Sequence, residues 1–207
     1  MSNQMKGTFI VFEGGEGSGK DTQIDILKEK LPTDTVFTRE PGGTELAEKL
    51  RILLLKRDTP ITPRAELMLF CAARADHVER VIAPALAAGK LVVSNRFDFS
   101  TIAYQVYGRE RLDLLADFRK FNTAAVANCQ PDLYLYLQLS VEVSLRRVAE
   151  RKDNDRFDAE AQSFHQRVKD GYDILAKKRD KCITVDASQS IDDVSYDISH
   201  VLQSHIH

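Results

Sequence analysis

Residues 14–22 read Gly-Gly-Glu-Gly-Ser-Gly-Lys-Asp-Thr, directly after the apolar run Thr-Phe-Ile-Val-Phe at residues 8–12. The apolar run predicts a buried strand, and the glycines after it allow consecutive backbone N–H groups to point at one oxyanion. The N-terminus of the next helix adds partial positive charge, and Lys20 adds a full charge on a flexible stem. The stretch therefore predicts a phosphate-binding turn between a strand and a helix.

The spacing Gly-x4-Gly-Lys, from residue 14 to Lys20, fits the P-loop of nucleotide-binding proteins. Ser or Thr usually follows this lysine and holds Mg²⁺. Here Asp21 follows it, with Thr22 one step later, so Asp21 is either a metal ligand or a favourable charge in the first helical turn. We expect the ATP phosphates to be bound by Gly14, Gly15, Glu16, Gly17, Ser18, Gly19, Lys20, Asp21 and Thr22. The candidate Mg²⁺ ligands are Glu16, Asp21 and Thr22.

Length and composition predict one domain over residues 1–207, because 207 residues with 43% hydrophobic side chains can form a single core. The net charge of −2 gives no overall attraction to nucleic acid or membranes, and we expect neither as a partner. No signal peptide or run of ~20 apolar residues is visible. Three widely spaced cysteines, outside any CxxC pattern, predict reduced thiols and a cytoplasmic protein.

Strand-like and helix-like segments alternate along the chain. Short apolar runs predict strands at 8–13, 35–38, 91–95, 133–139 and 182–186. Helical patterns lie at 20–31, 44–56, 64–88, 111–128, 141–151, 158–178 and 191–204. This alternation predicts an α/β P-loop fold of three layers, with a five-stranded parallel sheet flanked by helices.

In such sheets, ligands bind outside the carboxyl ends of the strands. The first three predicted strands are followed there by polar or glycine-rich segments, at 14–20, 39–44 and 95–97. We expect these segments to face one crevice. The segment 38–44 contains a proline and two glycines and allows close approach of a ligand, although the pattern alone also fits an ordinary turn.

Three further patterns have both a functional and a structural interpretation. Phe70 and Arg74 share a helix face and either bind a flat heterocycle or form a core phenylalanine with an arginine stem along it. Arg96 either meets a phosphate or lies at the surface beside an ordinary helix start. Segment 146–156 contains five arginine or lysine residues. It is either a mobile lid that places cations around a migrating phosphoryl group or a solvated helix end.

Together, these segments resemble those of thymidylate kinases, the enzymes that phosphorylate dTMP. The resemblance runs over nearly the whole chain, and its elements lie at 12–23, 39–44, 67–74, 96–105 and 155–157. The Glu-Pro-Gly-Gly-Thr and Ala-Tyr-Gln elements are more specific than the P-loop. Residues 15–18 contain no arginine, as in the bacterial type of the family, whose catalytic arginines lie in the lid.

The resemblance implies transfer of a phosphoryl group from ATP to dTMP, with Mg²⁺, in a homodimer. It implies that the catalytic residues are Lys20, Arg96 and the arginines of a lid near 147–157, namely Arg147, Arg151 and Arg156. It assigns dTMP binding to Glu40, Arg51, Phe70, Arg74, Arg96, Ser100, Thr101, Tyr104 and Gln105. In this assignment Phe70 stacks on thymine, Arg74 bonds to its edge, and Arg51 and Arg96 bind the phosphate.

Asn95 and Gln138 depart from the family, which usually has aspartate at both strand ends. Asparagine is nearly isosteric with aspartate but uncharged, so we hypothesise that Asp21 or Glu16 restores the acidity lost at Asn95. Two alternatives remain open: a deoxynucleotide kinase of different base specificity, and a nucleotide-binding protein with impaired catalysis.

Overall fold

The computed structural model describes residues 7–56, 60–150, 156–158 and 160–205, and it confirms the predicted five-stranded parallel sheet. The strand order is β2-β3-β1-β4-β5, and every neighbouring pair is parallel. The strands are β1 (Phe9–Glu13), β2 (Val36–Arg39), β3 (Val92–Asn95), β4 (Leu133–Gln138) and β5 (Cys182–Asp186). The strand that leads into the P-loop is therefore central in the sheet.

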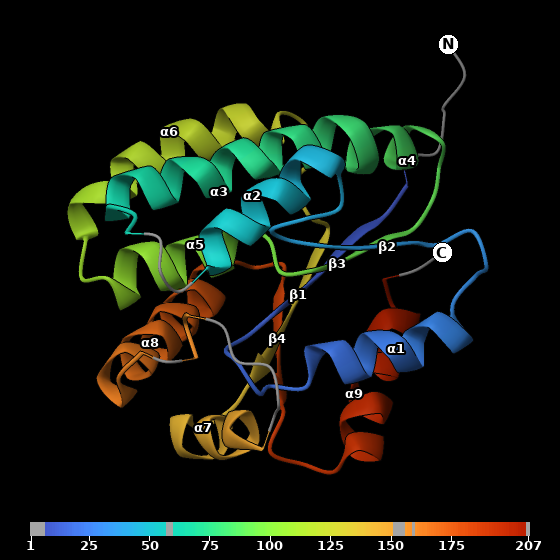
Figure 1. Cartoon of the computed structure of the whole chain (residues 1–207). Helices are drawn as coiled ribbons and strands as arrows, with labels where there is room; N and C mark the ends of the chain where they lie inside the picture. Colours follow the sequence, from blue (N-terminus) through green and yellow to red (C-terminus); the bar gives the residue numbers. More distant parts are fainter. Residues whose placement is uncertain (1–6, 57–59, 151–155, 159, 206–207) are drawn as a thin grey trace.

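Helices cover both faces of the sheet and make three layers (Figure 1). One face is covered by α2 (Glu45–Leu55), α3 (Pro63–His77), α4 (Ala83–Ala87), α5 (Asp98–Thr101), α6 (Leu115–Val126) and α8 (Gln162–Lys178). The other is covered by α1 (Lys20–Lys30) and α9 (Ile191–Gln203), with α7 (Val141–Ala149) beside them.

Alternate residues of the central strands pack into two separate cores. Phe9 and Val11 of β1 face the core that contains α8, whereas Ile10 and Phe12 face the core that contains α1 and α9. Both faces are therefore apolar, as the lack of alternation in the sequence predicted. The edge strands β2 and β5 are only partly buried, because each has a neighbour on one side alone.

Two helical regions differ from the prediction. The predicted helical ranges leave out residues 98–108, which form α5 and a π-helical turn, Ile102–Gly108. Most of this region is buried, so it lacks the amphipathic periodicity of a surface helix. The predicted helix 64–88 is divided by a π-helical turn, Val78–Ile82, just before Pro84. Proline has no N–H and crowds the carbonyl one turn earlier, and the wider turn relieves that clash.

The remaining boundaries shift by a few residues. A short 3₁₀ turn, Leu112–Leu114, precedes α6, and α8 begins at Gln162 rather than at 158. The centre of the charged segment, 151–155, lies outside the described residues. Within the described ranges no helix has the length and apolarity needed to cross a membrane. No disulfide links the three cysteines, all of which lie in the described residues; Cys71 is buried and the other two are half-buried.

Candidate active site

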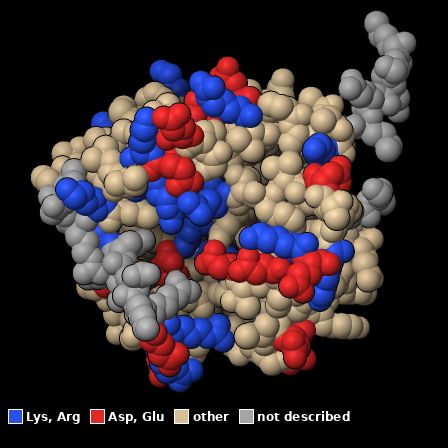
Figure 2. All heavy atoms as spheres, turned by 45° about the vertical axis from the view of Figure 1, so that its right-hand side comes forward, with Lys and Arg blue, Asp and Glu red and all other residues tan. Residues whose placement is uncertain are grey.

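A cavity of about 670 Å³ opens at the carboxyl ends of β1, β2 and β3, where the sequence predicted a crevice. The three segments that follow these strands all line it, and helices α2, α3 and α5 with the π turn close its far side. Figure 2 shows basic side chains gathered beside the hollow near the middle of the visible face. The lining residues used below are Glu16, Lys20, Asp21, Arg51, Phe70, Arg74, Asn95, Arg96, Ser100, Thr101, Tyr104 and Gln105.

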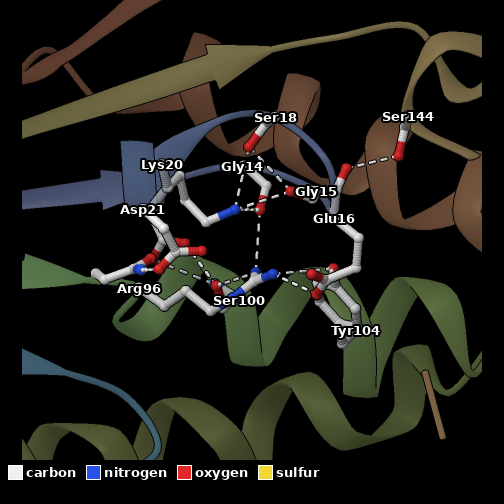
Figure 3. Close-up of polar contacts among 12 residues, drawn as sticks. Gly14, Gly15, Glu16, Ser18, Lys20, Asp21, Arg96, Ser100, Tyr104 and Ser144 are labelled. Carbon is white, nitrogen blue, oxygen red and sulfur yellow. Dashed lines mark hydrogen bonds and ion pairs between the residues drawn. The ribbon is translucent and has the colours of Figure 1, made fainter. Parts of the chain in front are cut away.

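Lys20 at the start of α1 lies folded back into the P-loop (Figure 3). Its Nζ donates to the carbonyl oxygens of Gly14 and Gly15 at 3.0 and 2.8 Å, and to Ser18 Oγ at 3.1 Å. Burial, together with nearby Arg96, lowers the pKa of Lys20 to about 7. An incoming phosphate would supply the negative charge that this buried amine lacks.

Helix α7 braces the back of the P-loop. Ser144 Oγ donates to the carbonyl oxygen of Glu16 at 2.6 Å, as Figure 3 shows, and Arg147 donates to that of Gly17 at 3.3 Å. Gly17 has a φ of 68°, and a Cβ there would lie 2.8 Å from the Ser144 carbonyl oxygen. Glycine is therefore required at this position by both conformation and space.

Arg96 directs its guanidinium into the centre of the site from the end of β3. Its backbone has a φ of 72°, a left-handed conformation that costs free energy for a residue with a side chain. The guanidinium donates to the Gly14 carbonyl at 3.0 Å and pairs with the carboxylate of Glu16. Tyr104, whose hydroxyl donates to the same carboxylate at 3.0 Å, lies against the guanidinium. Backbone strain held in place by such contacts is typical of functional sites.

Glu13, the last residue of β1, lies directly beneath Arg96 and is fully buried. Its carboxylate accepts hydrogen bonds from the N–H of Phe97 at 2.9 Å and from Ser100 Oγ at 2.6 Å. Burial raises the pKa of Glu13 to about 7, while the Ser100 hydrogen bond and the Arg96 charge oppose the rise. The charged form of the Glu13 carboxylate is thus stabilised by protein hydrogen-bond donors rather than by water.

The opposite end of the cavity has the chemistry of a base pocket. Arg74 is 1% exposed and donates through Nε to Glu40 at 2.8 Å and through Nη2 to Thr101 Oγ1 at 2.8 Å. Bonds to the carbonyl of Phe97 and to Asn122 leave one of its five N–H groups for a ligand. Gln105 is 1% exposed, and within the described residues its Nε2 has no hydrogen-bond partner. With Phe70 on the wall, the pocket offers unused donors beside an aromatic face.

Asp21 and Asn95 meet at the other side of the P-loop. The Asn95 amide donates through Nδ2 to Asp21 Oδ1 at 2.7 Å. Asn95 Oδ1 is buried and has no hydrogen-bond partner among the described residues. The helix start thus supplies a carboxylate next to an unused amide oxygen at the end of β3.

Comparison with known proteins agrees with this geometry. The sequence model of the family "Thymidylate kinase" matches residues 12–198. The chain belongs to the thymidylate kinase family. A thymidylate kinase of Desulfovibrio desulfuricans is 44% identical over 96% of both chains, and one of Synechococcus sp. (strain JA-2-3B'a(2-13)) is 51% identical over 81% of this chain and 80% of its own. The crystal structure of thymidylate kinase from Ehrlichia chaffeensis is 32% identical, covers 96% of this chain and 99% of its own, and superimposes with a TM-score of 0.77.

Most residues expected to act in a thymidylate kinase site line the cavity, and a few do not. Arg147 contacts the backbone behind the P-loop, and Arg156 pairs with the buried Glu66 of α3, so neither lines it. Thr22 is exposed on α1, and neither it nor Gly14 and Gly15 at the start of the loop belong to the lining. Arg151 lies outside the described residues. The roles expected of these residues stay predictions.

The structure also shows residues behind the cavity lining that sequence reasoning missed. Asn122 of α6 and His77 of α3 hold Arg74 and Glu40 from behind, and Tyr172 of α8 contacts Arg96. No local pattern identifies them, because their partners lie 37 to 76 residues away in the chain. Glu13 can be recognised in the sequence, because it is an acidic residue at the end of an apolar strand, but no role was predicted for it.

Proposed function

We propose that this protein transfers the γ-phosphoryl group of ATP to the phosphate of dTMP, giving dTDP and ADP. The observation that supports this most directly is that one cavity joins a P-loop lysine to a pocket with unused, buried hydrogen-bond donors. A protein that only bound ATP would need the first half of this cavity but not the second.

The acceptor phosphate is already anionic, so the reaction requires alignment and charge neutralisation rather than a strong base. In our proposal Lys20 spans donor and acceptor phosphates, while Arg96 and Arg51 bind the phosphate of dTMP. Arg51 lines the cavity from α2 and donates to the Pro41 carbonyl at 3.0 Å, which directs it across the acceptor end. The arginines 147, 151 and 156 are proposed to add positive charge when the segment near 147–157 closes.

We propose that the hydrogen-bond donors at the end of the cavity away from the P-loop determine which base is accepted. Thymine presents carbonyl oxygens, which accept hydrogen bonds, and a methyl group. The remaining N–H of Arg74 and the unpartnered Nε2 of Gln105 match an acceptor, and Phe70 supplies a face for stacking. Cytosine presents an amino group at the same edge, which would leave buried donors facing each other.

A panel of monophosphates tests this function. With ATP and dTMP, dUMP or dCMP at equal concentrations, chromatography should show the fastest diphosphate formation from dTMP. We expect kcat/KM for dCMP to be lower by about 100-fold or more, because a buried donor without an acceptor is costly. A preference for another base would favour the first alternative kinase, and absence of any diphosphate would favour a binding protein without catalysis.

Magnesium is proposed as the metal that accompanies ATP. The unpartnered Oδ1 of Asn95 and the carboxylate of Asp21 are oxygen ligands of the kind that this hard cation prefers. Glu16 is less suited, because its carboxylate is paired with Arg96 and Tyr104. Bound there, Mg²⁺ would neutralise negative charge on the transferring phosphates.

Asp21→Ala is therefore expected to weaken metal binding by about tenfold, because it removes the carboxylate of the pair and supplies no other ligand. The measurement is Mn²⁺ binding to the protein–ADP complex by electron paramagnetic resonance, together with the Mg²⁺ concentration that gives half-maximal rate. Asp25→Ala, one helical turn later on the exposed face of α1, is the matched control. Unchanged metal titrations in Asp21→Ala would contradict the assignment.

A homodimer in the cytoplasm completes the proposal. Exposed apolar side chains gather on the adjacent helices α2 and α3, where Leu46, Ile52, Leu53 and Met68 are 38–69% exposed. Such a patch is typical of a protein interface, and sedimentation velocity would measure the mass. The absence of disulfides among the three cysteines fits a reducing compartment, and localisation of a fluorescent fusion would test that.

A further inference from the structure

Glu13 has more hydrogen-bond donors than a buried structural carboxylate needs. Its Oε1 accepts from the backbone N–H groups of Phe97 and Ser100, at 2.9 and 3.3 Å. Its Oε2 accepts from Ser100 Oγ at 2.6 Å, and the oxygen of the Tyr172 hydroxyl lies 3.4 Å from it. All these donors belong to the turn that presents Arg96 or to side chains that touch its guanidinium.

The hydroxyl groups between Glu13 and Arg96 have one consistent order of donation. Ser100 has a single hydrogen, which it donates to Glu13. The Tyr172 hydroxyl, 2.7 Å away, therefore donates to Ser100 Oγ. Arg96 Nη1 shares its two hydrogens among the Tyr172 oxygen at 3.0 Å, Ser100 Oγ at 3.1 Å and the Gly14 carbonyl at 3.0 Å. Every donation in this chain runs from the guanidinium towards the carboxylate, and bonds aligned in this way strengthen one another.

The same carboxylate holds the strained backbone. Arg96 has its left-handed φ of 72°, and Glu13 binds the N–H of the next residue, Phe97. On the other side, the Arg96 N–H donates to the Phe12 carbonyl at 2.8 Å, one residue before Glu13. The end of β1 thus fixes both peptide groups around Arg96.

We propose that Glu13 is a positioning residue for Arg96: its charged carboxylate fixes the turn and orders the Tyr172–Ser100 hydroxyl chain that aims the guanidinium at the acceptor phosphate. This role rests on the proposed function, in which Arg96 binds dTMP. Glu13 itself does not line the cavity.

The substitution Glu13→Gln removes the charge of the side chain but keeps its size and shape. With its oxygen towards Phe97 and Ser100 N–H, the new amide would donate to Ser100 Oγ, which already accepts from Arg96. Ser100 could then no longer donate to position 13, and Tyr172 would lose its acceptor. The order of donation would be broken although the size of the side chain is unchanged.

The experiment measures dissociation constants for dTMP and for a non-hydrolysable ATP analogue by calorimetry at pH 8. We expect Glu13→Gln to weaken dTMP binding by about tenfold or more, since a charge-assisted network is lost, and to leave the ATP analogue within about twofold. In a Ser100→Ala background, Glu13→Gln should weaken dTMP binding by less than about threefold, because the hydroxyl that links position 13 to Arg96 is already absent. Asp98→Asn, which neutralises another buried acid that contacts Tyr134 and Arg179 instead, is the matched control and should leave dTMP affinity unchanged.

Each remaining outcome decides the question. A folded Glu13→Gln protein with wild-type dTMP affinity, or with equal losses for both nucleotides, overturns the proposal. If Glu13→Gln does not fold, Tyr172→Phe decides: dTMP binding weakened about threefold or more supports the hydroxyl chain, and unchanged binding overturns it. Failure of the proposed function gives a different result: the unsubstituted protein then neither binds dTMP nor forms dTDP. The positioning role of Glu13 would be overturned in that case as well.

Discussion

Lys20→Ala is expected to lower kcat by about 10³-fold, because the reaction loses a cation that stabilises charge on the transferring phosphoryl group. The amine is already inside the loop, within 3.1 Å of three loop oxygens, so only a short movement separates its resting position from a bound phosphate. The measurement is a coupled assay of ADP release with saturating ATP and dTMP.

The fold should tolerate this change. Removing the side chain takes away three hydrogen bonds, but it also removes an amine whose burial lowers its pKa to about 7. These effects oppose each other, so we expect the free energy of unfolding to change by less than about 2 kcal/mol. Lys28→Ala, on the exposed face of the same helix, is the control. Turnover near that of the unsubstituted protein would refute the assignment of Lys20.

Arg96→Ala is expected to lower kcat/KM for dTMP by about 10³-fold or more, since the acceptor phosphate loses its main cation. The loss should fall on dTMP and on the chemical step, while KM for ATP changes little. Alanine also leaves the carboxylates of Glu16 and Glu13 without their cationic neighbour, which adds repulsion towards an incoming phosphate.

Two measurements make this result specific. Arg80→Ala removes a 71% exposed arginine outside the cavity and should leave both KM values unchanged. Arg96→Lys keeps a charge but lacks the planar fork in which Nη1 contacts Ser100 and Tyr172 while Nη2 pairs with Glu16, so it should restore little activity. Full activity in Arg96→Ala would contradict the role given to this residue.

The sequence was sufficient for the sheet and for the end of the sheet at which the cavity opens. Short apolar runs are a strong signal when both faces of a sheet are covered, and the P-loop glycines are local. The region 98–108 could not be predicted in the same way. Its helical turns are buried on most sides, so no periodic pattern distinguishes them from a loop.

The candidate site was likewise predictable only where its residues belong to a local sequence pattern. Arg74 and Gln105 were named from the sequence. The sequence alone, however, also allowed Phe70 to be a core residue with the stem of Arg74 packed along it. The structure shows that Arg74 bonds Glu40, Asn122 and Thr101, contacts made by residues distant in the chain. Likewise, nothing in residues 141–149 indicates that Arg147 lies against the P-loop backbone. Such pairings arise from tertiary packing alone.

The hydrogen bond from Ser144 to the Glu16 carbonyl spans 128 positions of the chain. A ribosome will have produced the whole nucleotide-binding motif long before α7 emerges to support it. Tight ATP capture should therefore arise late in synthesis, and a fragment that stops before residue 140 should possess every motif glycine yet bind nucleotide poorly.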